Sequence, residues 1–151
     1  MTTLYPERYF DEFAVGEKFV TPQMTLTREE CLEFAKRWDP QPFHLDDAAA
    51  AASIFRKLSA SGWHTAAAAM RLLVDSGFMR GPGLFGVGID ELRWLAPVYP
   101  NDTLHVEGEI IELIPNPAGK RFGLMRIDTR VINQNGVCVM SYIANLSARM
   151  R

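Results

Sequence analysis

Cysteine is scarce in this sequence: only Cys31 and Cys138 occur in 151 residues. They form no CxxC pair, and no metal-ligand spacing surrounds either of them. We therefore interpret both as free thiols of an intracellular protein, packed as small apolar residues. This excludes a small scaffold held together by disulfides and predicts no metal site built on cysteine.

Long apolar runs and a basic surplus are also missing. No stretch approaches the roughly 20 apolar residues that a membrane-spanning helix needs, and residues 1–16 lack the apolar core of a signal peptide. Lys plus Arg number 16 against 18 Asp plus Glu, so the net charge of −2 gives no general basis for binding nucleic acid. We expect a cytoplasmic protein that binds neither nucleic acid nor membranes.

The composition is otherwise that of an ordinary globular domain. Hydrophobic residues make up 48% of the chain and charged residues 23%, which disfavours disordered and fibrous classes. A chain of this length typically buries roughly 70% of its unfolded surface, so it can build its own core. No repeat or linker divides the sequence, and we predict a single domain over residues 1–151.

The first half of the chain has the patterns of helices. A short β-type run over 19–26 precedes Thr27, which forms a capping-box pattern with Glu30. The helix that follows must stop at Asp39, because Pro40 disfavours helical backbone in the residue before it. Two prolines in three positions predict that residues 39–44 are extended and stiff.

Two further helices are predicted after this segment. An alanine-rich helix over about 47–58 has Asp46 or Asp47 as its N-cap, and a longer helix runs over about 61–78. Four alanines make the longer helix thin, which suits a place where other backbone comes close. Its apolar residues recur at helical spacing: Trp63, Ala66, Ala67, Met70, Val74 and Phe78.

Four strands are predicted in the second half, over about 84–97, 103–113, 122–132 and 137–148. The first is apolar on both parities, which is typical of a strand buried on both faces. The second and third alternate, and Asn135-Gly136 is a strong hairpin signal. A strand, then helices, then four sequential strands favours an α+β fold with a mainly antiparallel sheet.

Asp39 and His44 are the strongest candidates for chemistry. A stiff arm can hold a carboxylate and an imidazole in one geometry without a large entropy loss on binding. An ordinary histidine titrates near pH ~6.5, so it can give or take a proton at neutral pH. The alternative interpretation is a turn aspartate and a surface histidine.

Gly62 is a candidate of a different kind, since it lies at the start of the predicted long helix. A helix N-terminus has unpaired N–H groups and a partial positive charge, and glycine lets a ligand approach that backbone. The combination meets the needs of an oxyanion hole. Alternatively, Gly62 only permits the turn.

Three segments of the chain carry motifs: DPQPFH at residues 39–44, SGWH at residues 61–64 and LRWLAPVYPNDTL at residues 92–104. They are similar, in this order, to D-x-N-P-[LIV]-H, to A-H-G-M with Gly62 aligned to the glycine, and to F-x-x-P-V-x-x-G-D-x-L. These are the motifs of MaoC-like proteins, the family of (R)-specific enoyl-CoA hydratases, which the chain therefore resembles. The resemblance spans roughly residues 19–148, in the family's order.

The resemblance implies a hot-dog fold, in which an antiparallel sheet wraps a long central helix, and a homodimer or dimer of dimers. It implies that Asp39 and His44 hold a water and shuttle protons for syn addition to a 2-enoyl thioester, giving an (R)-3-hydroxyacyl thioester. The N–H of Gly62 would bind the thioester oxygen. The acyl group would be carried by CoA or an acyl carrier protein, and no cofactor is needed.

The family pattern is not fully kept around these residues. Gln41 replaces an asparagine, Phe43 a smaller aliphatic residue and Ser61 a histidine; we expect these three and Trp63 to contact the substrate. The departures leave open a non-catalytic module that binds acyl thioesters. A hot-dog thioesterase is disfavoured, because many carry an acid on the central helix and Asp75, the only acid there, is far from Gly62.

Other polar residues receive simpler interpretations. His64 and His105 are expected at the surface, and Asp75 is expected to pair with Arg71 at i,i+4. Several basic residues are weak candidates for contacts with CoA phosphates: Arg56, Lys57, Arg80, Arg93, Lys120 and Arg121.

Overall fold

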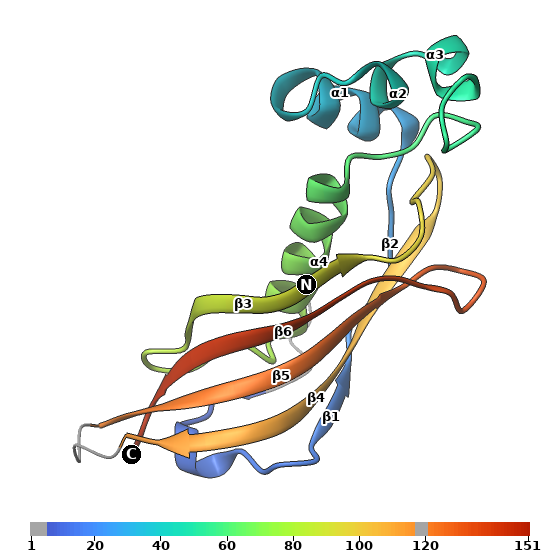
Figure 1. The fold of residues 1–151 in the computed structure, drawn as a ribbon. Coiled ribbons are helices and arrows are strands. Elements are labelled where there is room, and N and C mark those ends of the chain that lie inside the picture. Colours follow the sequence, from blue (N-terminus) through green and yellow to red (C-terminus); the bar gives the residue numbers. More distant parts are fainter. Residues whose placement is uncertain (1–5, 117–120) are drawn as a thin grey trace.

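An antiparallel sheet curls around one long helix in the computed structural model, which describes residues 6–116 and 121–151 (Figure 1). The described strands follow the order β1-β4-β5-β6-β3, and β2 pairs with β4 as well. Their bounds are Lys18–Val20 (β1), Met24–Thr25 (β2), Phe85–Trp94 (β3), Thr103–Pro115 (β4), Phe122–Ile132 (β5) and Cys138–Arg149 (β6). The predicted order of a strand region, helices and four sequential strands is confirmed.

Alternating side chains explain β4 and β5. Leu104, Val106 and Ile110 of β4 are fully buried, as are Met125 and Val131 of β5, while the residues that alternate with the buried positions are more exposed. The antiparallel pairing of β5 with β6 places a hairpin at Asn135-Gly136, where Gly136 has φ +76°. Both sequence predictions are therefore confirmed.

The long helix α4, Gly62–Ser76, matches the predicted 61–78 closely. Ser61 caps its N-terminus, and Gly77 ends it in the left-handed conformation, with φ 80°. The predicted apolar stripe, however, points largely to solvent: Trp63, Met70 and Val74 are 45–58% exposed. The helix instead turns another face towards the sheet, with these buried residues: Thr65, Ala68, Ala69, Leu72, Leu73 and Ser76.

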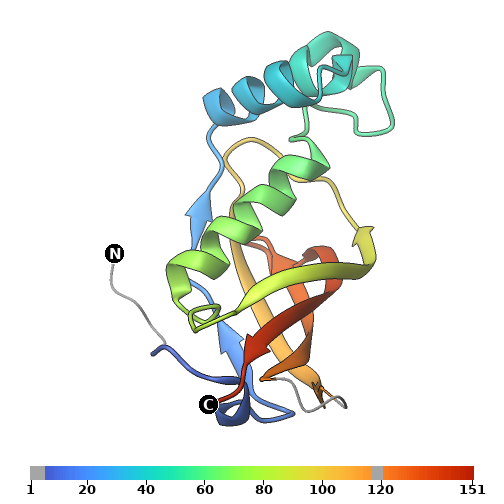
Figure 2. The ribbon, with the colours of Figure 1, turned by 90° about the vertical axis from the view of Figure 1, so that its left-hand side faces the viewer.

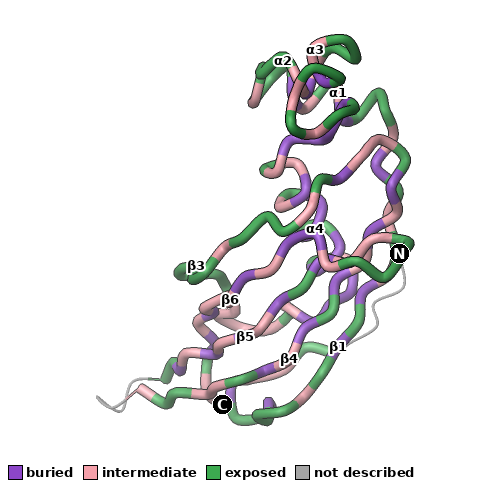
Figure 3. The backbone as a smooth tube through the Cα atoms, turned by 45° about the vertical axis from the view of Figure 1, so that its right-hand side comes forward, coloured by how far each residue is buried: buried purple, intermediate pink, exposed green. Residues whose placement is uncertain are grey.

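The prediction that the strand over 84–97 is buried on both faces is wrong for the single chain. β3 is an edge strand, and Phe85, Val87 and Ile89 are each more than half exposed (Figure 3). A strand with apolar residues at both odd and even positions has the same sequence pattern in two cases: inside a sheet, and at an edge that another chain covers. The pattern therefore identified an apolar strand correctly but did not show that the strand lies at the edge of the sheet.

Three short helices form a lobe beyond the N-terminal end of α4 (Figure 2). In α1, Arg28–Trp38, the predicted capping box is present: Glu30 N–H donates to Thr27 Oγ1 at 3.2 Å and Thr27 N–H donates to Glu30 Oε2 at 3.0 Å. Among the described residues, no helix has the length and apolarity to cross a membrane.

The other two helices of the lobe correct our expectations. Residues 39–44 are not extended throughout, because Pro42 begins a helical turn, α2, Pro42–Leu45. Proline is tolerated at this first helical position, where its missing N–H needs no partner. α3, Asp47–Ala51, stops well before Leu58, since the hydroxyl of Ser53 donates to the carbonyl of Ala50 at 2.7 Å and closes the last turn.

We predict that Gly108→Ala destabilises the protein by about 1–3 kcal/mol, because a new methyl group overpacks the core. A Cβ at Gly108 would lie 2.2 Å from Phe19 Cζ, and the Phe19 ring is itself stacked on Phe78 at 3.8 Å. Urea unfolding measures the difference. Gly88→Ala is the matched control, since its nearest contact is 4.0 Å away. Equal loss of stability in both variants would contradict this account.

Candidate active site

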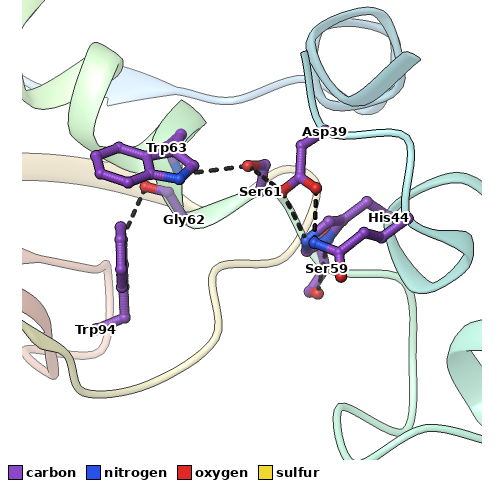
Figure 4. Close-up of polar contacts among 8 residues, drawn as sticks. Asp39, His44, Ser59, Ser61, Gly62, Trp63 and Trp94 are labelled. Carbon is purple, nitrogen blue, oxygen red and sulfur yellow. Dashed lines mark hydrogen bonds and ion pairs between the residues drawn. The ribbon is translucent and has the colours of Figure 1, made fainter. Parts of the chain in front are cut away.

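Asp39 and His44 lie together at the base of the lobe. Asp39 is the C-cap of α1, where its N–H donates to the carbonyl of Ala35 at 2.9 Å. The turn of α2 then brings His44 Nε2 to 3.3 Å from Asp39 Oδ2 (Figure 4). The expected pairing is therefore present, although a helical turn produces it and not an extended arm.

The orientation of His44 is set by a backbone carbonyl. Nδ1 of His44 lies 2.7 Å from the carbonyl oxygen of Ser59, and the imidazole is only 5% exposed. A carbonyl can only accept, so the hydrogen-bond network assigns the proton to Nδ1. Nε2 is then the ring nitrogen that faces Asp39 and the cleft.

Both oxygens of Asp39 accept hydrogen bonds. The hydroxyl of Ser61 donates to Oδ2 and the amide of Gln41 donates to Oδ1, each at 2.6 Å. Burial raises the pKa of Asp39, but the two hydrogen bonds, together with the charge of His44 when its ring is protonated, outweigh burial, so the pKa lies below its ordinary value. Asp39 is therefore ionised at neutral pH.

Gly62 is the first residue of α4, and its surroundings leave no room for a side chain. The indole Nε1 of Trp94 donates to the carbonyl of Gly62 at 2.8 Å, and a Cβ on Gly62 would lie 2.6 Å from that nitrogen. Within the described part of the chain, no acceptor bonds to the N–H of Gly62. This N–H is thus available to a ligand at the positive end of a 15-residue helix.

A cleft of about 410 Å³ connects these groups. Of the predicted substrate contacts, Gln41, Phe43 and Trp63 line it, whereas Ser61 is fully buried and touches Asp39 from behind. Ser61 is placed to position the carboxylate and not to contact a substrate. The remaining lining residues are Asp39, His44, Phe55, Ser59, Ala60, Gly62, Thr65, Trp94, Leu95, Ala96, Pro97 and Val98.

Among the cleft residues that sequence reasoning did not single out, Ser59 and Trp94 make hydrogen bonds to predicted site residues. Ser59 acts through its backbone carbonyl, which has no signature in a sequence. Trp94 lies inside the segment 92–104 that carried the family resemblance, so its aromatic ring could have been singled out there. Its ring packs edge-on against Trp63, with centroids 5.0 Å apart, and the two indoles form one wall.

The remaining polar residues lie outside the cleft. His64 is half-buried, stacks on Phe34 with centroids 4.7 Å apart, and has its pKa lowered by burial, so it is less exposed than expected. The expected ion pair between Arg71 and Asp75 is present at 2.8 Å. His105 Nε2 lies 3.1 Å from Glu107 on the outer face of β4. In residues 6–116 and 121–151, no group of three potential ligands could hold a metal ion.

Comparison with known proteins places the chain in a family. A family model described as a MaoC like domain matches residues 12–147. The chain belongs to this family. A MaoC-like dehydratase from Rhodospirillum rubrum is 38% identical, with a TM-score of 0.90 over 95% of this chain and 98% of that one. The hot-dog fold and the family resemblance are thereby confirmed.

Two hydratases are also similar to the chain. The (R)-hydratase PhaJ1 from Pseudomonas aeruginosa is 31% identical, with a TM-score of 0.73 over 95% of this chain and 86% of that one. A mesaconyl-CoA hydratase from Cereibacter sphaeroides is 42% identical over 65 residues, which are 43% of this chain and only 19% of that protein. Family and neighbours together support hydratase or dehydratase chemistry.

We predict that Ser61→Ala raises the pKa of Asp39, because one of the bonds that lower it is lost while the carboxyl stays partly buried. Titration of the carboxyl carbons by NMR measures this, with Asp128 as the internal control. By linkage, the wild type loses stability as the pH falls from the ordinary aspartate value through the lowered folded value, and the variant loses less. An unchanged Asp39 pKa would contradict the positioning role of Ser61.

Proposed function

We propose that the protein is a hydro-lyase that reversibly adds water, in the syn sense, to a 2-enoyl thioester to give an (R)-3-hydroxyacyl thioester. The observation that carries the proposal is the placement of Asp39 Oδ2 and His44 Nε2, 3.3 Å apart, in a cleft that the N-terminus of α4 enters. The family and the hydratases among the similar proteins favour the same chemistry.

The reaction uses one water and returns the site to its starting state. Asp39 is ionised, and His44 has a lone pair on Nε2, so together they hold a water and accept a proton from it. The water oxygen bonds to Cβ of the substrate as the double bond opens. The same proton then goes to Cα from the same side of the substrate, which makes the addition syn.

Negative charge grows on the thioester oxygen during this step. The free N–H of Gly62 would donate to that oxygen, and the dipole of α4 would add to the stabilisation. Acid–base catalysis of this kind supplies ~10²–10⁴-fold and one oxyanion donor about 10²–10³-fold. These contributions involve only groups of the protein.

Asp39→Asn and His44→Gln are each predicted to lower kcat by about 10²–10⁴-fold, because each removes a partner of the transferred proton. Loss of enoyl absorbance from crotonyl-CoA and octenoyl-CoA measures the rate, and chiral analysis identifies the product. His105→Gln is the matched control, since His105 lies outside the cleft. A folded wild type that binds both thioesters without turnover would support the binding-module alternative, and release of free CoA would indicate a thioesterase.

We propose further that two copies of the chain pair through β3 and the exposed stripe of α4. An unpaired edge strand tends to pair with another chain unless it is short, charged or covered. Phe85, Val87 and Ile89 leave a largely apolar edge on β3, and Trp63, Met70 and Val74 are exposed on α4, so a partner that covered both elements would remove these apolar side chains from water. Because Trp63 and Trp94 lie on these two elements, the partner would come close to the cleft.

Ile89→Lys is predicted to shift the protein from dimer to monomer, because a charge at the centre of an apolar contact must be desolvated. Sedimentation velocity measures the state. The control is Val20→Lys, since Val20 is similarly exposed but lies on β1 at the other edge of the sheet. A wild type that sediments as a monomer would overturn the proposed pairing.

A further inference from the structure

The structure separates the basic residues that the sequence left as weak candidates for phosphate contacts. Arg80 pairs with Glu7 at 3.4 Å beyond the C-terminal end of α4, roughly 22 Å along the helix from the cleft. Arg93 neighbours Trp94 in β3, and successive strand residues point to opposite faces, so Arg93 is directed away from the cleft wall. Lys120 lies outside the described residues, and Arg121, which is exposed, does not line the cleft.

Arg56 and Lys57 remain, and they sit next to the cleft. They belong to residues 52–58, the rim loop, which follows α3 and runs beside the connection between β3 and β4 (Figures 1 and 2). Phe55 of this loop lines the cleft, with its ring centroid 5.1 Å from that of Phe43 and 6.2 Å from that of His44. Two exposed cations therefore follow directly after a residue of the cleft wall.

Several contacts hold the rim loop in place. The N–H of Phe55 donates to Ser53 Oγ at 3.1 Å, and the N–H of Arg56 donates to the Ser53 carbonyl at 3.2 Å. Arg56 has φ 64°, a left-handed conformation that arginine rarely adopts and that the surrounding bonds must impose. From the other side, the hydroxyl of Tyr99 donates to the carbonyl of Phe55 at 3.2 Å.

No carboxylate of residues 6–116 or 121–151 forms an ion pair with the side chain of Arg56 or of Lys57. Lys57 Nζ lies 3.9 Å from the centre of the Tyr99 ring, which holds the ammonium without neutralising it. Among the ion pairs of the described residues, none includes Arg56 or Lys57, whereas Arg28, Arg71 and Arg130 each face a carboxylate. Two unneutralised cations that follow a residue of the cleft wall favour an anionic ligand.

We propose that Arg56 and Lys57 bind the phosphate groups of the pantetheine carrier to which the acyl group is attached. The inference rests on the proposed function, since only an acyl thioester substrate brings such a carrier to this cleft. CoA and the prosthetic group of an acyl carrier protein share this chemistry: a phosphorylated pantetheine arm that leads the thioester inward. Arginine and lysine are the side chains that bind phosphate best.

The test compares one acyl group on carriers with and without phosphate. For the Arg56→Ala/Lys57→Ala variant, we expect KM for crotonyl-CoA to rise about tenfold with kcat unchanged. KM for crotonyl-pantetheine, which has no phosphate, is expected to stay the same, and this retained activity shows that the variant folds. The wild-type preference for crotonyl-CoA should also weaken with added salt.

A matched variant separates position from charge. Lys18→Ala/Arg121→Ala removes two exposed cations that do not line the cleft, and it should leave both KM values unchanged. A rise with crotonyl-CoA assigns the phosphate to CoA, and a rise confined to a crotonyl acyl carrier protein assigns it to that prosthetic group. The proposal is overturned if KM rises equally for crotonyl-pantetheine, if no carrier shows a rise, or if the Lys18/Arg121 variant behaves like the Arg56/Lys57 variant.

Binding of free CoA distinguishes this inference from the proposed function. Calorimetry of CoA with both variants needs no turnover, and the Arg56/Lys57 variant should bind about tenfold more weakly than the wild type. If wild type hydrates neither crotonyl thioester but binds CoA through these residues, the proposed function fails and the phosphate site stands. Equal CoA affinity in wild type and variant, with no rise in KM for the crotonyl acyl carrier protein, overturns the phosphate site alone.

Discussion

The hydrogen bond between His44 and the carbonyl of Ser59 is the contact on which the site depends. This carbonyl belongs to the segment 59–61, which joins the lobe to α4. Each of its three residues contacts a different part of the structure. The carbonyl of Ser59 meets His44, the N–H of Ala60 donates to the carbonyl of Val98 at 2.7 Å, and the hydroxyl of Ser61 donates to Asp39. A three-residue segment thus fixes the imidazole of His44, the carboxylate of Asp39 and the start of α4 relative to one another.

The geometry of the pair leaves both groups available for chemistry. A charge-assisted hydrogen bond between nitrogen and carboxylate oxygen is typically about 2.7–2.9 Å long, whereas His44 Nε2 and Asp39 Oδ2 are 3.3 Å apart. Ser61 and Gln41 satisfy the carboxylate, so it does not need a closed contact with the imidazole to remain ionised. A water can therefore be shared by two groups that are held near each other but not locked together.

Local sequence signals predicted most of the elements, and their failures have physical causes. The capping box at Thr27, the alternation of β4 and β5, and the Asn135-Gly136 hairpin are short-range patterns, so the sequence predicts them well. The helical turn at Pro42 was missed because proline both breaks helices and begins them. Position within the chain, and not residue type, decides between the two.

The buried face of α4 and the carbonyl that orients His44 were harder to predict than the helices and strands themselves. Both stripes of α4 are apolar or small, so periodicity alone cannot identify the one that faces the sheet. The pairing of Asp39 with His44 was predicted from two residues five positions apart, but Ser59, which orients His44, acts through backbone that every residue possesses. The support of a site is therefore less visible in the sequence than the reacting groups themselves.

Trp94 links the chemistry to the exposed edge of the molecule. Its indole donates to the carbonyl of Gly62 and occupies the space that a Cβ would need, so the position of Gly62 depends on a residue at the end of β3. Under the proposed pairing, β3 is also the strand that the second copy would cover. If that strand were displaced, the Trp94 indole would move against the first turn of α4. Contact between the two copies would then be coupled to the position of the Gly62 N–H through this one side chain.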